Sequence, residues 1–328
     1  MSLKPAVYQS TDPGAPALTG QADSLIALLD AILVNGYGYG SGAEAKAPLG
    51  WTREFQGVNK RVYRNNVVSG SGYRLRVDDS NAQYALMRGF ESMHTVDTGT
   101  GPVPMVAQSA NGLLWPKSAT ANSTARAWFA VGTERCFYLF INHTGTVDQF
   151  SPHFAGDIVS YLPDDQHCFA VSSTAQSTYS SGFGRNRNFV SMTQNLSNVE
   201  ATAATAAMYV GRKADGTLGA APLASFAPLY RGFSYYVWGS VGSNSSAEWP
   251  APPNGGVFGF PGLLMEGPRR FRGEYPGVIA PCADLAYGDA NFVPGQAMVS
   301  KRFSASPTTA VESSSVGEVI LDLGREWH

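Results

Sequence analysis

The sequence predicts a mainly β protein, with β-sandwich or jelly-roll-like domains, one short N-terminal helix and long loops. Three observations favour this class. The chain contains 36 glycines and 20 prolines, which bend the backbone too often for long helices. From about residue 50 onward, short runs in which apolar and polar residues alternate recur between turn-forming residues. Helical periodicity is strong in one stretch, close to the N-terminus.

The N-terminal region predicts an extended arm followed by this helix. Residues 1–20 are rich in Pro, Gly, Ser and Thr, and we expect them to lie on a neighbouring subunit. In GQADSLIALLDAILVNGYG, Asp23 or Ser24 can cap the helix and Asn35-Gly36 can stop it. At about ten residues this helix is too short to be stable alone, so it must dock on another surface. Its wide apolar stripe comprises Leu25, Ile26, Leu28, Leu29, Ile32 and Leu33.

Strands are predicted along most of the remaining chain. The stretch RAWFAVGTERCFYLFIN predicts a hairpin that turns at Gly132-Thr133. Its second arm is almost continuously apolar, which is typical of a central strand covered on both faces. A second hairpin is predicted in AAMYVGRKADGTLGA, with Asp215-Gly216 in a tight turn. The other predicted strands lie in NKRVYRNN, SGYRLRVDDS, QYALMRGF, FSYYVWGSVG, GVFGFPGLLME, QAMVSKRFS and GEVILDL.

A change in composition near residues 151–165 suggests a domain boundary. The stretch that follows is small, polar and weakly patterned, which predicts long loops. We therefore expect an N-terminal arm and helix over residues 1–45 and a first β domain over 46–155. A second β domain with a loop-rich insertion is expected over 156–328.

Composition points to a chain that meets other subunits. Charged residues make up 15% of the sequence, against roughly 25% in an ordinary soluble domain, while aromatic residues make up 12%. Protein interfaces are depleted in Lys and Glu and enriched in Tyr, Trp and Phe, so a homo-oligomer is expected. The alternative is an ordinary Ser/Thr-rich β protein. A net charge of −2 gives no support for a nucleic-acid partner.

Targeting and cysteine patterns favour synthesis in the cytoplasm. The N-terminus has no apolar segment of the signal-peptide kind, and no run approaches the ~18 apolar residues of a membrane span. Cys136, Cys168 and Cys282 are odd in number and widely spaced, which argues against a disulfide framework. Cys136 lies in an apolar run and is predicted to be a buried thiol.

Motifs for catalysis or cofactor binding are missing from the sequence. The five histidines show no metal-ligand spacing, and no nucleophile elbow or phosphate-binding loop occurs. The doublets Asp78-Asp79 and Asp164-Asp165 sit where strands end, and adjacent carboxylates on an extended chain point apart. A Ca²⁺ site at either doublet is the alternative, without a supporting loop motif. We therefore expect no enzyme, cofactor or metal.

Several stretches resemble virion structural proteins of bacteriophages, of the minor tail or baseplate-associated kind. The resemblance covers most of the first 140 residues and residues 256–328. It is carried by LIALLDAILVNGYG, PLGWTREFQGVNKRVYRNN, YRLRVDDS, ALMRGFESM, DTGTGPVP, LLWPKS, GFPGLLMEGPRRFRGEYPGVIAPCADL and GEVILDLGREWH.

The resemblance implies a multi-copy subunit of the virion, such as a tail-tip, baseplate or collar component, that holds its neighbours together in a ring or trimer. It implies no cofactor and no catalytic residue. Two alternatives stay open: a polysaccharide-degrading enzyme, which needs a carboxylate pair in a groove, and a module that binds a receptor or glycan on the host surface. The glycan reading would use aromatic side chains at Tyr37, Tyr39, Phe183, Tyr235, Tyr236, Trp238, Trp249 and Trp327. The predicted assembly interface comprises Leu25, Leu28, Leu29, Ile32, Trp249 and Trp327.

Overall fold

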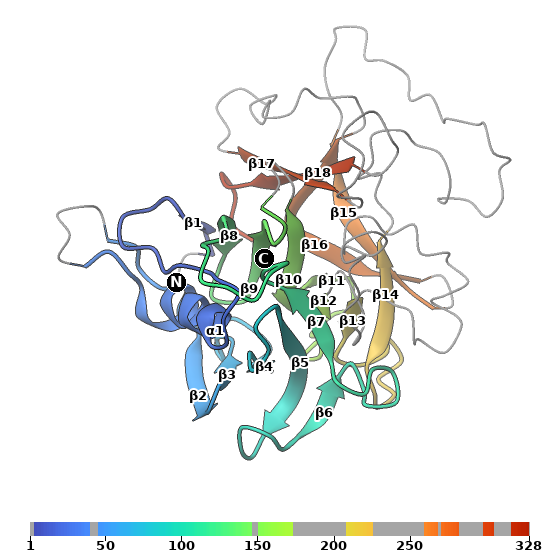
Figure 1. Cartoon of the computed structure of the whole chain (residues 1–328). Helices are drawn as coiled ribbons and strands as arrows, with labels where there is room; N and C mark the ends of the chain where they lie inside the picture. Colours follow the sequence, from blue (N-terminus) through green and yellow to red (C-terminus); the bar gives the residue numbers. More distant parts are fainter. Residues whose placement is uncertain are drawn as a thin grey trace, which may run out of the picture.

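The computed structural model describes residues 3–39, 45–145, 150–172, 208–225, 259–267, 270–281, 298–304 and 316–327. Within these ranges the chain is mainly β with one short helical segment, which confirms the predicted fold class. The strands form two antiparallel sheets that pack against each other (Figure 1).

The smaller sheet contains six strands in the order β2-β3-β4-β5-β6, with β7 paired to the long strand β5. The strands predicted over residues 60–64 and 74–78 are both present. In residues 74–78 the buried Leu75 and Val77 alternate with polar side chains, as predicted. In residues 60–64 the alternation fails, because the adjacent Val62 and Tyr63 are both buried, Tyr63 in the main core and Val62 in a separate small cluster on the other face. These strands are β2 (Thr52–Gly57), β3 (Lys60–Arg64), β4 (Arg74–Asp78), β5 (Tyr84–Met93), β6 (Gly99–Val103) and β7 (Leu113–Pro116).

The larger sheet runs in the order β1-β8-β9-β10-β12-β13-β14-β15-β16-β18-β17, and the short strand β11 pairs with β16. Its strands are β1 (Ala6–Gln9), β8 (Trp128–Gly132), β9 (Cys136–Ile141), β10 (Ser151–Asp157), β11 (Val159–Ser160), β12 (Phe169–Ser172), β13 (Met208–Val210), β14 (Ala221–Ser225), β15 (Gly259–Glu266), β16 (Arg270–Pro281), β17 (Met298–Ser304) and β18 (Val316–Asp322).

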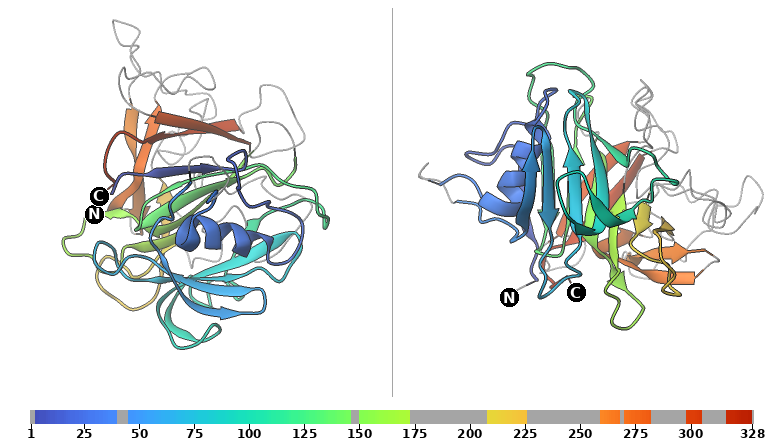
Figure 2. Two further views of the ribbon diagram at one scale, coloured as in Figure 1. Left: turned by 90° about the vertical axis from the view of Figure 1, so that its left-hand side faces the viewer. Right: turned by 90° about the horizontal axis from the view of Figure 1, so that it is seen from below.

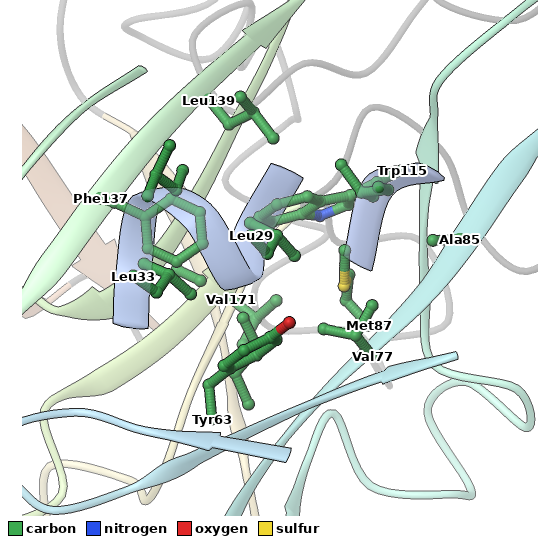
Figure 3. Close-up of a cluster of buried hydrophobic side chains, with 14 of the residues drawn as sticks. Leu29, Leu33, Tyr63, Val77, Ala85, Met87, Trp115, Phe137, Leu139 and Val171 are labelled. Carbon is green, nitrogen blue, oxygen red and sulfur yellow. The ribbon is translucent and has the colours of Figure 1, made fainter. Parts of the chain in front are cut away.

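The main core lies between the two sheets and is closed by the helix. Figure 3 shows Leu29 and Leu33 of the helix above Tyr63 of the smaller sheet and beside Phe137 of the larger sheet. In the left view of Figure 2 the helix lies in front of the strands, along the side of the molecule where both sheets are seen together. The helix is therefore an integral part of the chain's own core.

Strand β9 is buried on both faces, as its continuous apolar sequence predicted. Phe137 and Leu139 face the main core, whereas Tyr138 and Phe140 belong to a second core. This second core is formed on the other face of the larger sheet, with side chains from β15, β16 and β18 and the C-terminal Trp327. The hairpin predicted around Gly132 is confirmed, since β8 and β9 pair along their length.

The helical segment consists of α1 (Ser24–Leu29) and a π-helical continuation, η1 (Asp30–Asn35). Its predicted end is confirmed: the segment stops at Asn35, and Gly36 has a positive φ of 71°. Asp23 occupies the N-cap position, as predicted, but the predicted capping by its side chain is wrong. The Asp23 side chain makes no capping hydrogen bond, and Ser24 Oγ donates to carbonyl oxygens that precede the helix. The capping carboxylate comes instead from a distant part of the chain.

The N-terminal segment and the expected domain boundary are placed differently from the prediction. Residues 6–9 form β1, an edge strand of the larger sheet that pairs with β8 of the same chain. The expected boundary between residues 155 and 156 falls inside β10, which pairs with β9 on one edge and β12 on the other. The larger sheet is therefore continuous across this position.

The second predicted hairpin is formed by β13 and β14, and Asp215-Gly216 lies in the loop between them. The Gly216 N–H donates to the Lys213 carbonyl oxygen at 2.9 Å, which closes the turn. The loops expected over residues 173–207 and the strand expected over 233–242 lie outside the described residues.

Candidate functional site

Four side chains of the predicted assembly interface are fully buried in the chain itself. Leu25, Leu28, Leu29 and Ile32 have no exposed surface and belong to the main core between the sheets. The apolar stripe of the helix therefore packs against the sheets of the same chain. An interface with a neighbouring subunit stays a prediction, and these four residues offer it no accessible surface.

Of the two tryptophans in the predicted assembly interface, Trp327 is buried in the chain and Trp249 is not among the described residues. Trp327 is 2% exposed, and its ring lies edge-on to Tyr138 with the ring centroids 5.6 Å apart. Its indole N–H donates to the Asp322 carbonyl oxygen at 2.8 Å, and its backbone N–H donates to Leu3 at 3.0 Å. Trp327 thereby fastens the C-terminal segment to the N-terminal one. Trp249 lies outside the described residues.

Among the aromatic side chains considered for glycan binding, Tyr37 is buried and Tyr39 is exposed. Tyr37 is buried beside Tyr8 and Trp128, and its hydroxyl donates to Asp12 Oδ2 at 2.5 Å. Tyr39 is 64% exposed and so could contact a partner. The remaining candidates, Phe183, Tyr235, Tyr236 and Trp238, lie outside the described residues.

A buried ion pair stands at the N-terminus of the helix. Asp79 Oδ2 accepts hydrogen bonds from the backbone N–H groups of Leu25, at 2.8 Å, and Ile26, at 3.3 Å. These are donors of the first helical turn, which lack partners inside the helix. Lys117 Nζ donates to Asp79 Oδ1 and to the Gln21 carbonyl oxygen. Neither charged side chain has any exposed surface, so both are sealed from water.

Burial makes the charged forms of Asp79 and Lys117 less stable relative to their neutral forms. It raises the pKa of Asp79 to about 6, although Lys117 and the two N–H groups act in the opposite direction. Burial also lowers the pKa of Lys117, against the attraction of the carboxylate. Both shifts bring the neutral pair, a carboxylic acid beside an amine, closer in free energy to the ion pair. Nothing in the sequence separates Asp79 from its neighbour Asp78, which is partly exposed and lies 3.8 Å from Lys60 Nζ.

A second polar cluster joins the two sheets at the protein surface. Arg212, which follows β13, donates to both carboxylate oxygens of Glu91 in β5, at 2.6 and 2.7 Å. The Tyr73 hydroxyl lies 2.9 Å from His167 Nδ1, and the Tyr73 ring stacks on Phe169. The hydrogen bonds from Arg212 hold the pKa of Glu91 below its usual value. The cluster therefore acts as a charged clasp between strands of different sheets.

A third cluster ties distant parts of the larger sheet together. Arg272 in β16 is 1% exposed and contacts Asp165 Oδ2 at 2.5 Å, Glu266 Oε2 at 3.3 Å and Ser160 Oγ at 2.6 Å. Glu266 also accepts a hydrogen bond from the backbone N–H of Ala214 at 3.0 Å. One guanidinium group thus links the β11 region, β15, β16 and the loop of the second hairpin.

Two histidines are buried and have no charged partner among the described residues. His153 in β10 has no exposed surface and stacks on Trp115, with the ring centroids 4.7 Å apart. Neither of its ring nitrogens has a hydrogen-bond partner among the described residues. His143 Nδ1 lies 2.8 Å from Ser151 Oγ. Burial lowers the pKa of His143 to about 4 and that of His153 well below its usual value, so both are neutral at pH 7.

The predicted burial of the Cys136 thiol is confirmed. Cys136 and Cys168 are both free and buried, and burial raises the pKa of Cys136 to about 12. Cys282 lies outside the described residues. Over the ranges that the structure describes, no group of three His, Cys, Asp or Glu side chains is placed to hold a metal ion. In the same ranges, no helix has the length and apolar character needed to cross a membrane.

The fold and these contacts define a mainly β, two-sheet protein whose buried charges tie separate elements together. No protein-family model matches the sequence, and no curated protein matches it. The function therefore has to be argued from the chain's own residues.

Proposed function

We propose that this chain is a structural subunit of a bacteriophage particle, a tail-tip, baseplate or collar component that holds neighbouring subunits together. The observation that carries the proposal is the composition, in which a low charged fraction of 15% accompanies 12% aromatic residues. The resemblance of its N-terminal and C-terminal stretches to minor tail proteins supports the same role.

The contacts within the chain are compatible with a stiff building block. Asp79 joins the β4–β5 region to the helix, Glu91 and Arg212 join the two sheets, and Arg272 gathers three segments of the larger sheet. The pairs made by Asp79 and Arg272 are buried, and removing one partner of a buried pair costs about 3–5 kcal/mol, so these contacts resist separation. A subunit that transmits load within a particle needs this resistance.

Assembly is proposed to place several copies in a ring or trimer beside other virion subunits. Closed symmetry is the ordinary way for a chain to bury a repeated interface. The copies would be made in the bacterial cytoplasm and end in the virion.

The direct test is to locate the chain in purified particles. Mass spectrometry of virions should detect it at several copies per particle, and electron microscopy should place its density in the tail or baseplate. The proposal fails if purified virions lack the chain while infected cells contain it.

Binding of a host-surface glycan is a second candidate, favoured by the exposed Tyr39. Exposed aromatic rings stack on sugars, and their removal weakens such binding. A glycan array probed with the full chain and with Tyr39→Ala would distinguish the two roles. Saturable binding lost in Tyr39→Ala supports the glycan role, whereas a purely structural subunit shows no saturable binding.

A further inference from the structure

We propose that Lys117 and Asp79 form a covalent amide cross-link inside the fold, an intramolecular isopeptide bond. The inference does not depend on the proposed function. It rests on the placement of one amine, one carboxyl group and two backbone N–H donors at a site where neither charged side chain has any exposed surface. These are the groups that an acyl-transfer reaction requires.

The nucleophile is the Lys117 amine. It is held against Asp79 Oδ1 and is oriented by a second hydrogen bond, 2.5 Å long, to the Gln21 carbonyl oxygen. A buried lysine becomes nucleophilic when it loses its proton, and burial favours that loss. The lowered pKa of Lys117 agrees with this requirement.

The electrophile is the carboxyl carbon of Asp79, and the helix supplies an oxyanion hole. The N–H groups of Leu25 and Ile26 both point at Oδ2, the oxygen that would carry negative charge in a tetrahedral intermediate. Oδ1, on the side of the lysine, would leave as water. The folded chain therefore already places Oδ2 at the N–H donors, where the oxyanion would form, and Oδ1 at the lysine, where the leaving oxygen would be protonated.

The reaction needs no external reagent. A proton passes from the ammonium group of Lys117 to the carboxylate of Asp79, which gives an amine and a carboxylic acid. The nitrogen then forms a bond to the carboxyl carbon, the bond from that carbon to the hydroxyl oxygen breaks, and the hydroxyl leaves with a proton from the nitrogen. One water molecule is lost, one amide is formed, and no atom changes its oxidation state.

A second lysine–carboxylate pair, Lys60 and Asp97, provides a comparison for the burial and hydrogen bonding of Lys117 and Asp79. Lys60 Nζ lies 2.8 Å from Asp97 Oδ1, but the Asp97 side chain is 50% exposed. Water stabilises both charges there, and Asp97 Oδ1 accepts from Arg76 as well. Close approach alone is therefore present in both pairs, whereas burial and the two backbone donors distinguish Asp79.

Intact-mass measurement of the full chain tests the inference. We expect the purified protein, kept folded at pH 6–7, to be lighter than its sequence by one water molecule, after any N-terminal methionine removal is counted. Trypsin should fail to cut after Lys117, and the peptides over residues 77–88 and 89–126 should appear joined. Localisation matters, because Asp215-Gly216 can also lose water by forming a succinimide.

Three variants sharpen the test. Lys117→Arg keeps a cation beside Asp79 but cannot form the bond, so it should have its full sequence mass. Asp79→Asn should form the same bond with loss of ammonia instead of water, and the joined peptides distinguish this loss from succinimide formation at an Asn-Gly pair such as Asn35-Gly36. Lys60→Arg, in the exposed pair, should keep the water loss. A wild-type protein of full sequence mass with separate peptides overturns the inference, as does a water loss that maps to another peptide.

Discussion

Trp327 packs directly on a glycine, and this contact yields a quantitative prediction. Gly277 in β16 has a φ of 70°, and a Cβ atom added there would lie 2.2 Å from Nε1 and Cε2 of the Trp327 ring. The ring cannot withdraw without losing the hydrogen bond from its indole N–H to Asp322. We therefore expect Gly277→Ala to disturb the C-terminal segment.

Two costs add at this position. An L-residue held at positive φ loses about 1–2 kcal/mol relative to glycine. Overpacking of a closed site costs a further ~1–3 kcal/mol. Gly277→Ala should therefore lower the free energy of unfolding by ~2–5 kcal/mol.

Gly216→Ala is the matched control, because Gly216 has a similar φ of 79° but no atom of the described part of the chain lies within 4 Å of its added Cβ. It should show only the backbone cost of ~1–2 kcal/mol. The difference between the two variants isolates the collision with Trp327.

The assay is urea-induced unfolding, followed by far-ultraviolet circular dichroism, of the wild type, both alanine variants, Trp327→Ala and the pair Gly277→Ala/Trp327→Ala. In the Trp327→Ala background, Gly277→Ala should cost no more than Gly216→Ala costs in the wild type, since the colliding ring is gone. The reasoning is refuted if Gly277→Ala and Gly216→Ala destabilise the wild-type chain equally.

Three further predictions follow from the buried polar groups. His153→Phe should stabilise the chain at pH 7 by ~1–2 kcal/mol, because it replaces two buried nitrogens beside Trp115, which have no hydrogen-bond partner in the described ranges, with carbon. The folded state keeps His153 neutral, so below pH ~6.5 only the unfolded state takes up a proton at this residue. The free energy of unfolding should therefore fall by ~1.4 kcal/mol for each pH unit below that value. Unfolding curves at several pH values should show this dependence in the wild type and its reduction in His153→Phe. Arg272→Met should cost ~3–5 kcal/mol in urea unfolding, because two buried carboxylates lose their cation, and a cost under 1 kcal/mol would contradict the role of that cluster. In a variant whose remaining cysteine is serine, Cys136 and Cys168 should react with a thiol reagent at pH 8 only after denaturant is added, and rapid labelling of the native chain would contradict their burial.

Patterns that depend on neighbouring residues were sufficient to predict much of the fold. The alternation in β4, the continuous apolar run of β9 and the stop at Asn35-Gly36 each arise within a few residues of sequence. They could therefore be predicted from the sequence alone. The overall class, two antiparallel sheets with a short helix, follows from these elements together with frequent turns.

Elements stabilised by distant residues could not be predicted in this way. Strand β10 contains Ser151, His153 and Asp157, which are polar residues typical of a loop, yet the whole strand is buried. Asp157 is accommodated because Asn65 and Ser71, more than eighty residues earlier, donate hydrogen bonds to it. The sequence shows these polar residues but gives no sign of their distant partners, so a boundary was predicted where a central strand lies.

The candidate site was missed for the same reason. Lys117 and Asp79 are 38 residues apart, and the helix that supplies the two N–H donors lies a further 53 to 54 residues before Asp79. Each residue looks ordinary in its own segment. Conversely, the apolar stripe of the helix was correctly recognised as a docking face, but the sequence could not say that its partner is the same chain.

The distant cap of the helix also sets an order of events during synthesis. Residues 24–35 leave the ribosome well before Asp79, which lies 54 residues after Leu25. Until β4 and Asp79 have emerged, the first helical turn lacks its carboxylate, and so short a segment is unstable without tertiary contacts. A nascent chain that stops before residue 79 therefore leaves Leu25, Leu28 and Leu29 without the later strands that cover them in the folded chain.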